Sequence, residues 1–176
     1  MHDFASMRAL PNLTILAPCD AVQTEYLTDL LCQFTGPVYM RMGRGDVPPV
    51  YEAGEKFEIG KIKTVCEGTD ATIIACGEMV APAKKAAELL QAEGISVRVL
   101  DCFTIQPMDT KTVEKALRET RAVVTVEEHS TRGGLGEAVS HIAAELRGSA
   151  PMRLLGLPEE VVIGKSQELF AYYGLT

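Results

Sequence analysis

The chain has 176 residues, of which 47% are hydrophobic, and a formal net charge of −7. This length suits one domain, or one small domain with part of another, and the composition favours a folded core over disorder. No basic run exceeds the pair Lys84–Lys85, so nucleic acid is not expected as a partner. No apolar run approaches the ~18–20 residues of a membrane helix, so a membrane is not expected either.

The five cysteines are scattered through apolar runs and form no C-x-x-C pair or Cys/His cluster. This pattern predicts reduced core thiols in a cytoplasmic protein, without disulfides or a metal site. The first residues lack a basic stretch followed by an apolar one, so they do not read as a signal peptide.

The first elements form a partial strand–helix–strand unit. The apolar run 13–18 ends in proline and predicts a buried strand. Asp20 with Gln23 predicts a capping box that opens a helix over 21–34, and a Gly-Pro pair then stops it. A second strand follows over 38–42, and the two strands should be parallel.

Two strands and a helix are too little for a stable parallel sheet, which normally has several strands covered on both faces. We therefore interpret residues 1–50 as the remnant of a domain that other residues or another chain complete. Prolines, glycines and acidic residues are concentrated after this unit and predict a linker at 51–56. Residues 57–176 are expected to form a whole domain.

In that second region, strands alternate with helices, which predicts an open, mostly parallel α/β sheet with helices on both faces. Strands are expected over 57–68, 70–77, 95–102, 122–128 and 152–158. Helices are expected over 79–94, 107–121, 133–148 and 168–175. Gly94 is expected just past the end of its helix, and Asp109 is expected to cap the N-terminus of the next one.

One loop at a predicted strand end carries several polar residues and glycines. Its candidate interface or ligand-loop residues are Glu127, Glu128, His129, Gly133, Gly134 and Gly136. One hypothesis is an anion site at the N-terminus of the following helix. The other is that the glycines permit a tight turn or a protein contact, and it agrees better with two acidic residues that would repel phosphate.

The same loop does not predict a catalytic centre. Glu127 and Glu128 are neighbours on a strand and should face opposite sides. His129 is expected to be a hydrogen-bonded interface residue, because the sequence supplies it with no nucleophile. No catalytic residue, metal ligand or cofactor-binding residue is predicted within this chain.

Arg44 stands at a glycine-lined strand exit, directly after Gly43. A surface arginine would explain it. The alternative is a phosphate contact, because an arginine at the carboxyl end of a parallel strand can grip phosphate with two hydrogen bonds. Arg41 has the opposite parity, so a regular strand would place it on the other face.

Six stretches, taken in order, resemble the carboxyl-terminal section of transketolases, most closely the split form carried on two polypeptides. They are ASMRALPNLTILAPCD, GPVYMRMGRGDVP, DATIIACGEMV, VLDCFTIQPMD, VVTVEEHSTRGGLGEAV and the terminal YYGLT. The resemblance implies that 1–50 is the tail of a pyrimidine-binding domain and that 57–176 is a transketolase carboxyl-terminal domain. It also implies a cytoplasmic dimer or other homo-oligomer of the pentose phosphate pathway.

The family moves two-carbon ketol units between sugar phosphates, using thiamine diphosphate and Mg²⁺. Its activating glutamate and its Thr-His-Gln motif would lie before Met1, and His2 does not match that motif. Its metal-binding motif belongs to an amino-terminal section, which is the implied partner. The resemblance thus implies no cofactor on this chain alone, inactivity in isolation, and contact between Arg44 and the substrate phosphate.

Other readings remain open at this point. One is a non-catalytic dimerisation or regulatory module. This alternative agrees with the lack of a predicted catalytic arrangement in residues 57–176. The others are the matching part of a 2-oxo acid dehydrogenase beta subunit or of a deoxyxylulose-phosphate synthase, which share this domain order.

Overall fold

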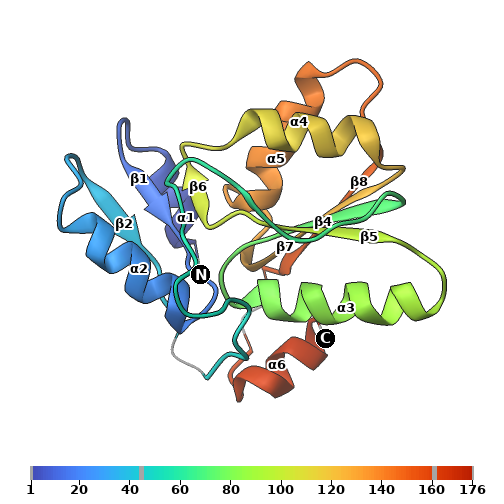
Figure 1. Cartoon of the computed structure of the whole chain (residues 1–176), viewed down its shortest axis with the longest axis horizontal. Coiled ribbons are helices and arrows are strands. Elements are labelled where there is room, and N and C mark those ends of the chain that lie inside the picture. The colour runs from blue at the N-terminus through green and yellow to red at the C-terminus, as the bar shows by residue number, and fades with distance from the viewer. Residues whose placement is uncertain (1, 44–45, 160–161, 176) are drawn as a thin grey trace.

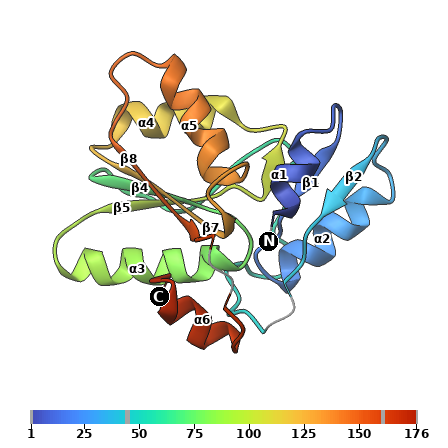
Figure 2. The same cartoon turned by 180° about the vertical axis from the view of Figure 1, so that it is seen from behind.

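The computed structural model of the chain describes residues 2–43, 46–159 and 162–175 (Figure 1). Its first elements form a small unit beside a larger sheet, as Figures 1 and 2 show from opposite sides. The unit consists of α1 (Asp3–Arg8), β1 (Thr14–Leu16), α2 (Ala21–Leu31) and β2 (Val38–Met40). The strands β1 and β2 pair in parallel, which confirms the predicted strand–helix–strand unit.

The larger sheet has five strands in the order β3-β5-β4-β7-β8. Only β3 runs antiparallel to its neighbour, so the predicted mostly parallel sheet is confirmed. The strands are β3 (Lys63–Cys66), β4 (Ala71–Ala75), β5 (Val97–Asp101), β7 (Val123–Ser130) and β8 (Met152–Leu157). β7 continues two residues beyond the predicted end because Ser130 still pairs with Leu157 of β8.

Helices cover both faces of this sheet, as predicted, with α3 on one face and α4 and α5 on the other (Figure 1). They are the short 3₁₀ turn η1 (Gly77–Met79), then α3 (Val80–Ala92), α4 (Thr110–Glu119), α5 (Leu135–Glu145) and α6 (Ser166–Tyr172). Each face has its own hydrophobic core, and each core includes residues of the first unit. Phe4 and Ile15 join the α4–α5 core, whereas Leu27 joins the α3 core.

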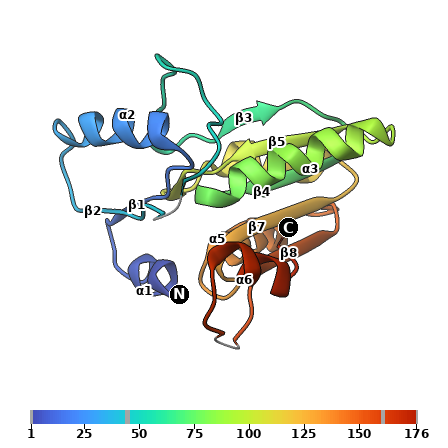
Figure 3. The same cartoon turned by 90° about the horizontal axis from the view of Figure 1, so that it is seen from below.

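Two elements were missing from the sequence prediction. The first is α1, and Figure 3 shows α1 and α2 on opposite faces of the small sheet. The second is β6 (Thr104–Gln106), which pairs antiparallel with β1. The small sheet therefore has the order β2-β1-β6, and β2 is its edge strand among the described residues. Thus β6, which lies after residue 100 in the sequence, pairs with the side of β1 that β2 leaves open.

Local capping accounts for three helix boundaries. Asp109 caps α4 by accepting a hydrogen bond of 3.3 Å from Thr112 N–H, as predicted. Gly94 follows α3 with φ of +81°, the left-handed conformation that ends helices. Asp20 caps α2 through a 2.8 Å bond from Gln23 N–H. In the predicted capping box, the Gln23 side chain would accept a hydrogen bond from Asp20 N–H. It accepts one from Cys19 N–H instead.

The predicted linker is held at its start by the cap of α2. Asp20 Oδ2 accepts hydrogen bonds of 2.9 Å from the backbone N–H groups of Val50 and Tyr51. One carboxylate therefore caps the first turn of a helix and anchors the chain after β2.

Among the described residues, no helix is both long enough and apolar enough to cross a bilayer.

Candidate functional site

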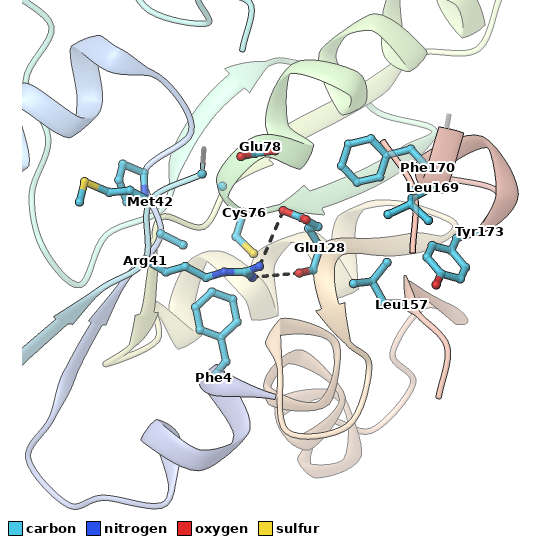
Figure 4. Close-up of a pocket in the computed structure, with 15 residues that line it drawn as sticks. Phe4, Arg41, Met42, Cys76, Glu78, Glu128, Leu157, Leu169, Phe170 and Tyr173 are labelled. Carbon is cyan, nitrogen blue, oxygen red and sulfur yellow. Dashed lines mark hydrogen bonds and ion pairs between the residues drawn. The ribbon is translucent and has the colours of Figure 1, made fainter. Parts of the chain in front are cut away.

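A cavity of about 420 Å³ opens where both sheets end (Figure 4). Its walls follow the carboxyl ends of β1, β2 and β4 and the ends of β7 and β8, and α6 closes one side. This is the place where open α/β sheets usually bind ligands. The labelled lining residues are Phe4, Arg41, Met42, Cys76, Glu78, Glu128, Leu157, Leu169, Phe170 and Tyr173.

Arg41 connects three elements at the floor of this cavity. Its Nη1 donates a 2.9 Å hydrogen bond to the backbone oxygen of Glu128, and its Nη2 lies 3.7 Å from the Glu128 carboxylate (Figure 4). Its Nε lies 3.5 Å from Asp3 Oδ2 in α1. The guanidinium carbon also lies 5.1 Å from the centre of the Phe4 ring, within the range of a cation–π contact.

Two carboxylates face the same cavity. Burial raises the pKa of Glu128, and the nearby charge of Glu78 raises it further, whereas Arg41 opposes both effects. Glu78 also lies directly against the backbone of Gly43, where a Cβ would overlap its carboxylate. The described wall thus carries two acidic groups and one arginine, which disfavours an anionic ligand in this cavity.

Glu127 points to the other side of β7, as the alternation of the strand predicts. Its carboxylate is fully buried and accepts hydrogen bonds of 2.8 Å from Leu135 N–H and 2.7 Å from Gly136 N–H. It therefore occupies the N-terminus of α5, where the dipole and free amides favour an anion. Burial raises its pKa to about 7, although those two amide bonds act in the opposite direction.

The glycines of the loop are explained by close approaches within the chain. A Cβ at Gly134 would overlap the Glu127 carboxylate, and one at Gly133 would overlap Ala5 of α1. Arg8 of α1 adds hydrogen bonds of 2.7 and 3.1 Å to the backbone oxygens of Gly133 and Gly134. The loop is thus packed between α1 and the Glu127 carboxylate.

His129 is fully buried in the same region. Its Nδ1 donates a 2.6 Å hydrogen bond to the Ser130 carbonyl, and its ring lies 5.0 Å from that of Phe4. Burial lowers its pKa, so the ring is neutral at neutral pH. Nε2 is buried without a hydrogen-bond partner among the described residues.

The residue singled out most clearly by the sequence, Arg44, lies outside the described residues. The structure instead emphasises Arg41, which the sequence placed only on the opposite strand face from Arg44, and a fully buried group that the sequence did not single out, Asp101. Asp101 Oδ2 accepts hydrogen bonds of 2.8 Å from Gln23 Nε2 and 2.8 Å from the Tyr51 hydroxyl. Burial raises the Asp101 pKa to about 7, and these two bonds oppose the shift. The sequence feature that could have drawn attention to Asp101 is an acidic residue in an otherwise apolar strand.

The described residues do not fit thiamine diphosphate with its metal. The N-terminal amides of α5 are already used by Glu127, so they are not available to a diphosphate. The cavity lining includes the carboxylates of Glu78 and Glu128 without a third acidic residue or a histidine, and the described residues contain no group of three or more His, Cys, Asp or Glu side chains placed to hold a metal ion.

The fold and this strand-end cavity define the class of protein as an α/β protein in which a strand–helix–strand unit packs against an open, mostly parallel sheet. The family described as "Transketolase, C-terminal domain" matches residues 60–176. The chain belongs to this family.

Relatives and solved structures agree with this assignment. The chain is 47% identical to one subunit of the apulose-4-phosphate transketolase of Phocaeicola vulgatus, over 99% of this chain and 56% of that protein. It is 35% identical to the transketolase of Rattus norvegicus, over 99% of this chain and 28% of that protein. The chain thus spans only about half, or less, of the relatives it matches.

One solved structure, described as "Split gene transketolase, inactive beta4 tetramer", matches with a TM-score of 0.90 and 42% identity. This match extends over 99% of the present chain and 56% of the chain in that structure. A transketolase complex with a sugar phosphate from Pichia stipitis matches with a TM-score of 0.77 over all of this chain and 25% of that one. At 24% identity, the second match shows the shared fold.

Proposed function

We propose that this chain is the carboxyl-terminal part of a transketolase that moves two-carbon ketol units between sugar phosphates in the cytoplasm. Thiamine diphosphate and Mg²⁺ supply the covalent chemistry when they are bound to the complete enzyme. This chain contributes an assembly surface and Arg44, which contacts the substrate phosphate. The family match over 60–176 is the observation that carries the proposal.

An amino-terminal section is the partner, and it supplies the cofactor site. The match to a relative that is named as one subunit of a transketolase supports this arrangement, as does the use of the α5 N-terminus by Glu127. The isolated chain is therefore inactive, and the solved relative that is described as an inactive tetramer supports that expectation.

The edge strand β2 is the surface where preceding residues or the partner complete the small sheet. Thr14 N–H bonds to Pro37 O, and Arg41 N–H bonds to Leu16 O, so the backbone groups of the odd-numbered residues in and around β2 point toward β1. The backbone groups of Val38 and Met40 therefore face the open edge, since alternate residues of a strand bond to opposite sides. An unpaired edge of this kind is a template for another strand.

Reconstitution tests the proposal. The purified chain alone should show no ketol transfer and no submicromolar binding of thiamine diphosphate with Mg²⁺ in isothermal titration. Activity should appear when the chain is combined with the amino-terminal section, supplied either as a separate chain or fused upstream. The donors should include apulose 4-phosphate, which the 47% identical relative suggests. Turnover by the isolated chain would contradict the proposal.

The alternative of a non-catalytic module makes a different prediction in the same assay. Arg44→Ala should raise the KM for phosphorylated donors if the arginine contacts the phosphate. An unchanged KM would favour the module, in which Arg44 has only a structural role.

A further inference from the structure

The strand-end cavity has a polar side and an apolar side (Figure 4). On the polar side, Glu78 from the turn after β4 and Glu128 from β7 lie near Arg41. On the apolar side, the wall is formed by Leu157 of β8 and Phe170 of α6. The volume of about 420 Å³ lies within the range that small-molecule sites occupy, about 300–1,000 Å³. A cavity with these two walls suits a ligand that has one charged end and one apolar end.

The polar side carries more negative than positive charge. The charge of Arg41 is shared by two carboxylates, because its Nε lies 3.5 Å from Asp3 Oδ2 and its Nη2 lies 3.7 Å from Glu128 Oε2. Glu78 adds another carboxylate to the lining, and it takes part in no ion pair among the described residues. Three carboxylates at or beside the cavity thus accompany one guanidinium, and the group that would restore the balance is a cation.

The two lining carboxylates also act on each other. Burial raises the pKa of Glu128, and the negative charge of Glu78 raises it further. The Glu78 carboxylate is packed directly against Gly43, where a Cβ would overlap it, so its place in the wall is restricted. A cation near both carboxylates would relieve their repulsion, since an opposite charge favours the ionised form of each group.

The apolar side can accept the body of such a ligand. Leu157, Phe170 and Tyr173 are half-buried and pack against the α3 core. An apolar ligand body would remove more of their surface from water, which is favourable. The face of an aromatic ring also attracts a cation, so the apolar wall does not exclude a charged ligand.

We propose that the strand-end cavity binds a small organic cation, an ammonium group carried on a short apolar or aromatic body. The ammonium group lies near Glu78 and Glu128, and the body lies against Leu157 and Phe170. The walls come from both the small unit and the larger sheet, so the bound ligand holds the two together. This inference does not depend on the proposed ketol transfer, because the cavity is formed within this chain.

Phenethylamine, which is protonated at neutral pH, is the probe. Isothermal titration of the purified chain should give a Kd of about 1 mM or lower, and the melting temperature should rise with probe concentration. Phenethyl alcohol has the same body without the charge and should bind roughly fivefold more weakly, because hydrogen bonds to charged groups are stronger than neutral ones. Hydrocinnamate, the anionic counterpart, should not bind. Equal affinity for the amine and the alcohol, or binding of hydrocinnamate, would overturn the proposal.

Glu78→Gln tests the charged wall. It should weaken the binding of phenethylamine roughly fivefold and leave that of phenethyl alcohol unchanged. Glu88→Gln is the matched control, because it removes the same charge from an exposed position on α3, where Glu88 lies 3.3 Å from Lys85. The control should leave both affinities unchanged. Equal weakening in the two variants would mean that the net charge of the chain attracts the amine, which contradicts a site in the cavity.

Methyl NMR locates the bound probe in the unmodified chain. The methyl signals of Met42 and Leu157, which line the cavity, should shift as phenethylamine is added. The methyl signals of Leu89, which is 60% exposed on α3, should not shift. If melting curves show that Glu78→Gln does not fold, these shifts and the comparison of the three probes still decide the question. Shifts that leave Met42 and Leu157 unaffected would place the amine elsewhere and overturn the proposal.

Discussion

The Tyr51 hydroxyl donates a 2.8 Å hydrogen bond to Asp101 Oδ2, which joins the start of the predicted linker to the end of β5. Gln23 of α2 donates to the same oxygen at 2.8 Å. Asp101 is fully buried, and its second oxygen, Oδ1, has no hydrogen-bond partner among the described residues. A single carboxyl group thus links the helix of the small unit, the chain that leaves it and the larger sheet.

Asp101→Asn should reduce the pH dependence of stability between about pH 4 and pH 7. The pKa of Asp101 is about 7 in the folded chain and about 3.8 as an ordinary aspartate. Between these values, the unfolded state has lost the proton that the folded state keeps, so the wild-type free energy of unfolding falls as pH rises. Chemical denaturation of the purified chain across this range measures the slope.

Glu127 contributes a remaining slope of the same sign in this variant, because burial also raises its pKa to about 7 from an ordinary value of 4.5. The Asp101→Asn slope should therefore be smaller than that of the wild type without reaching zero. A slope equal to that of the wild type would show that Asp101 ionises in the folded chain as readily as it does in the unfolded chain.

Tyr51→Phe should lower the free energy of unfolding by about 1–2 kcal/mol, because it removes a donor from a buried carboxyl group. Tyr26→Phe is the matched control. Tyr26 packs edge-on against the same Phe57 ring as Tyr51 does, so the ring contact is retained in both variants. Equal losses in the two variants, measured by chemical denaturation, would argue against a contribution of the Tyr51–Asp101 bond.

Gly134→Ala should destabilise the chain by about 2 kcal/mol or more, because the new Cβ would overlap the buried Glu127 carboxylate and crowd His129. Moving Glu127 away would also weaken its bonds to the start of α5. Gly164→Ala is the control, since its Cβ would meet only side-chain atoms, the nearest being the end of Leu169 at 3.3 Å. Thermal melts followed by circular dichroism compare the two, and similar melting temperatures would refute this account of the loop.

Asp109→Ala should cost about 1–2 kcal/mol of stability, because Asp109 caps α4 and also accepts a 3.2 Å bond from Ile62 N–H. Asp109→Asn is expected to lose less than Asp109→Ala, since asparagine is a comparable cap but has a single accepting oxygen and so loses the bond from Ile62 N–H. If the two variants unfold at the same denaturant concentration, the cap is not the source of the effect.

Self-association of the purified chain is expected from the open edge of β2. Among the described residues, the backbone groups of Val38 and Met40 that point away from β1 have no partner strand, so they can pair with a second copy of the chain. Light scattering at several concentrations measures the mass. A clean monomer at all concentrations would count against the edge as an assembly surface.

The sequence by itself determined most of the local elements and their order, with α1 and β6 as the exceptions. Alternating apolar strands and amphipathic helices are short-range patterns, so the five-stranded sheet, the Asp109 cap and the Gly94 helix end could be predicted and are confirmed. The family could also be predicted, because its motifs are continuous stretches. The opposite facing of Glu127 and Glu128 followed from the alternation of a strand.

Only the tertiary structure decided which distant residues meet. β6 is three residues long, and its partner β1 lies about ninety positions earlier, so no local pattern reveals their pairing. In the same way, Arg41 meets Glu128, and Gln23 meets Asp101, across 87 and 78 positions. Such contacts depend on how whole elements pack, and packing is settled by the shape and burial of the assembled chain and not by its sequence periodicity.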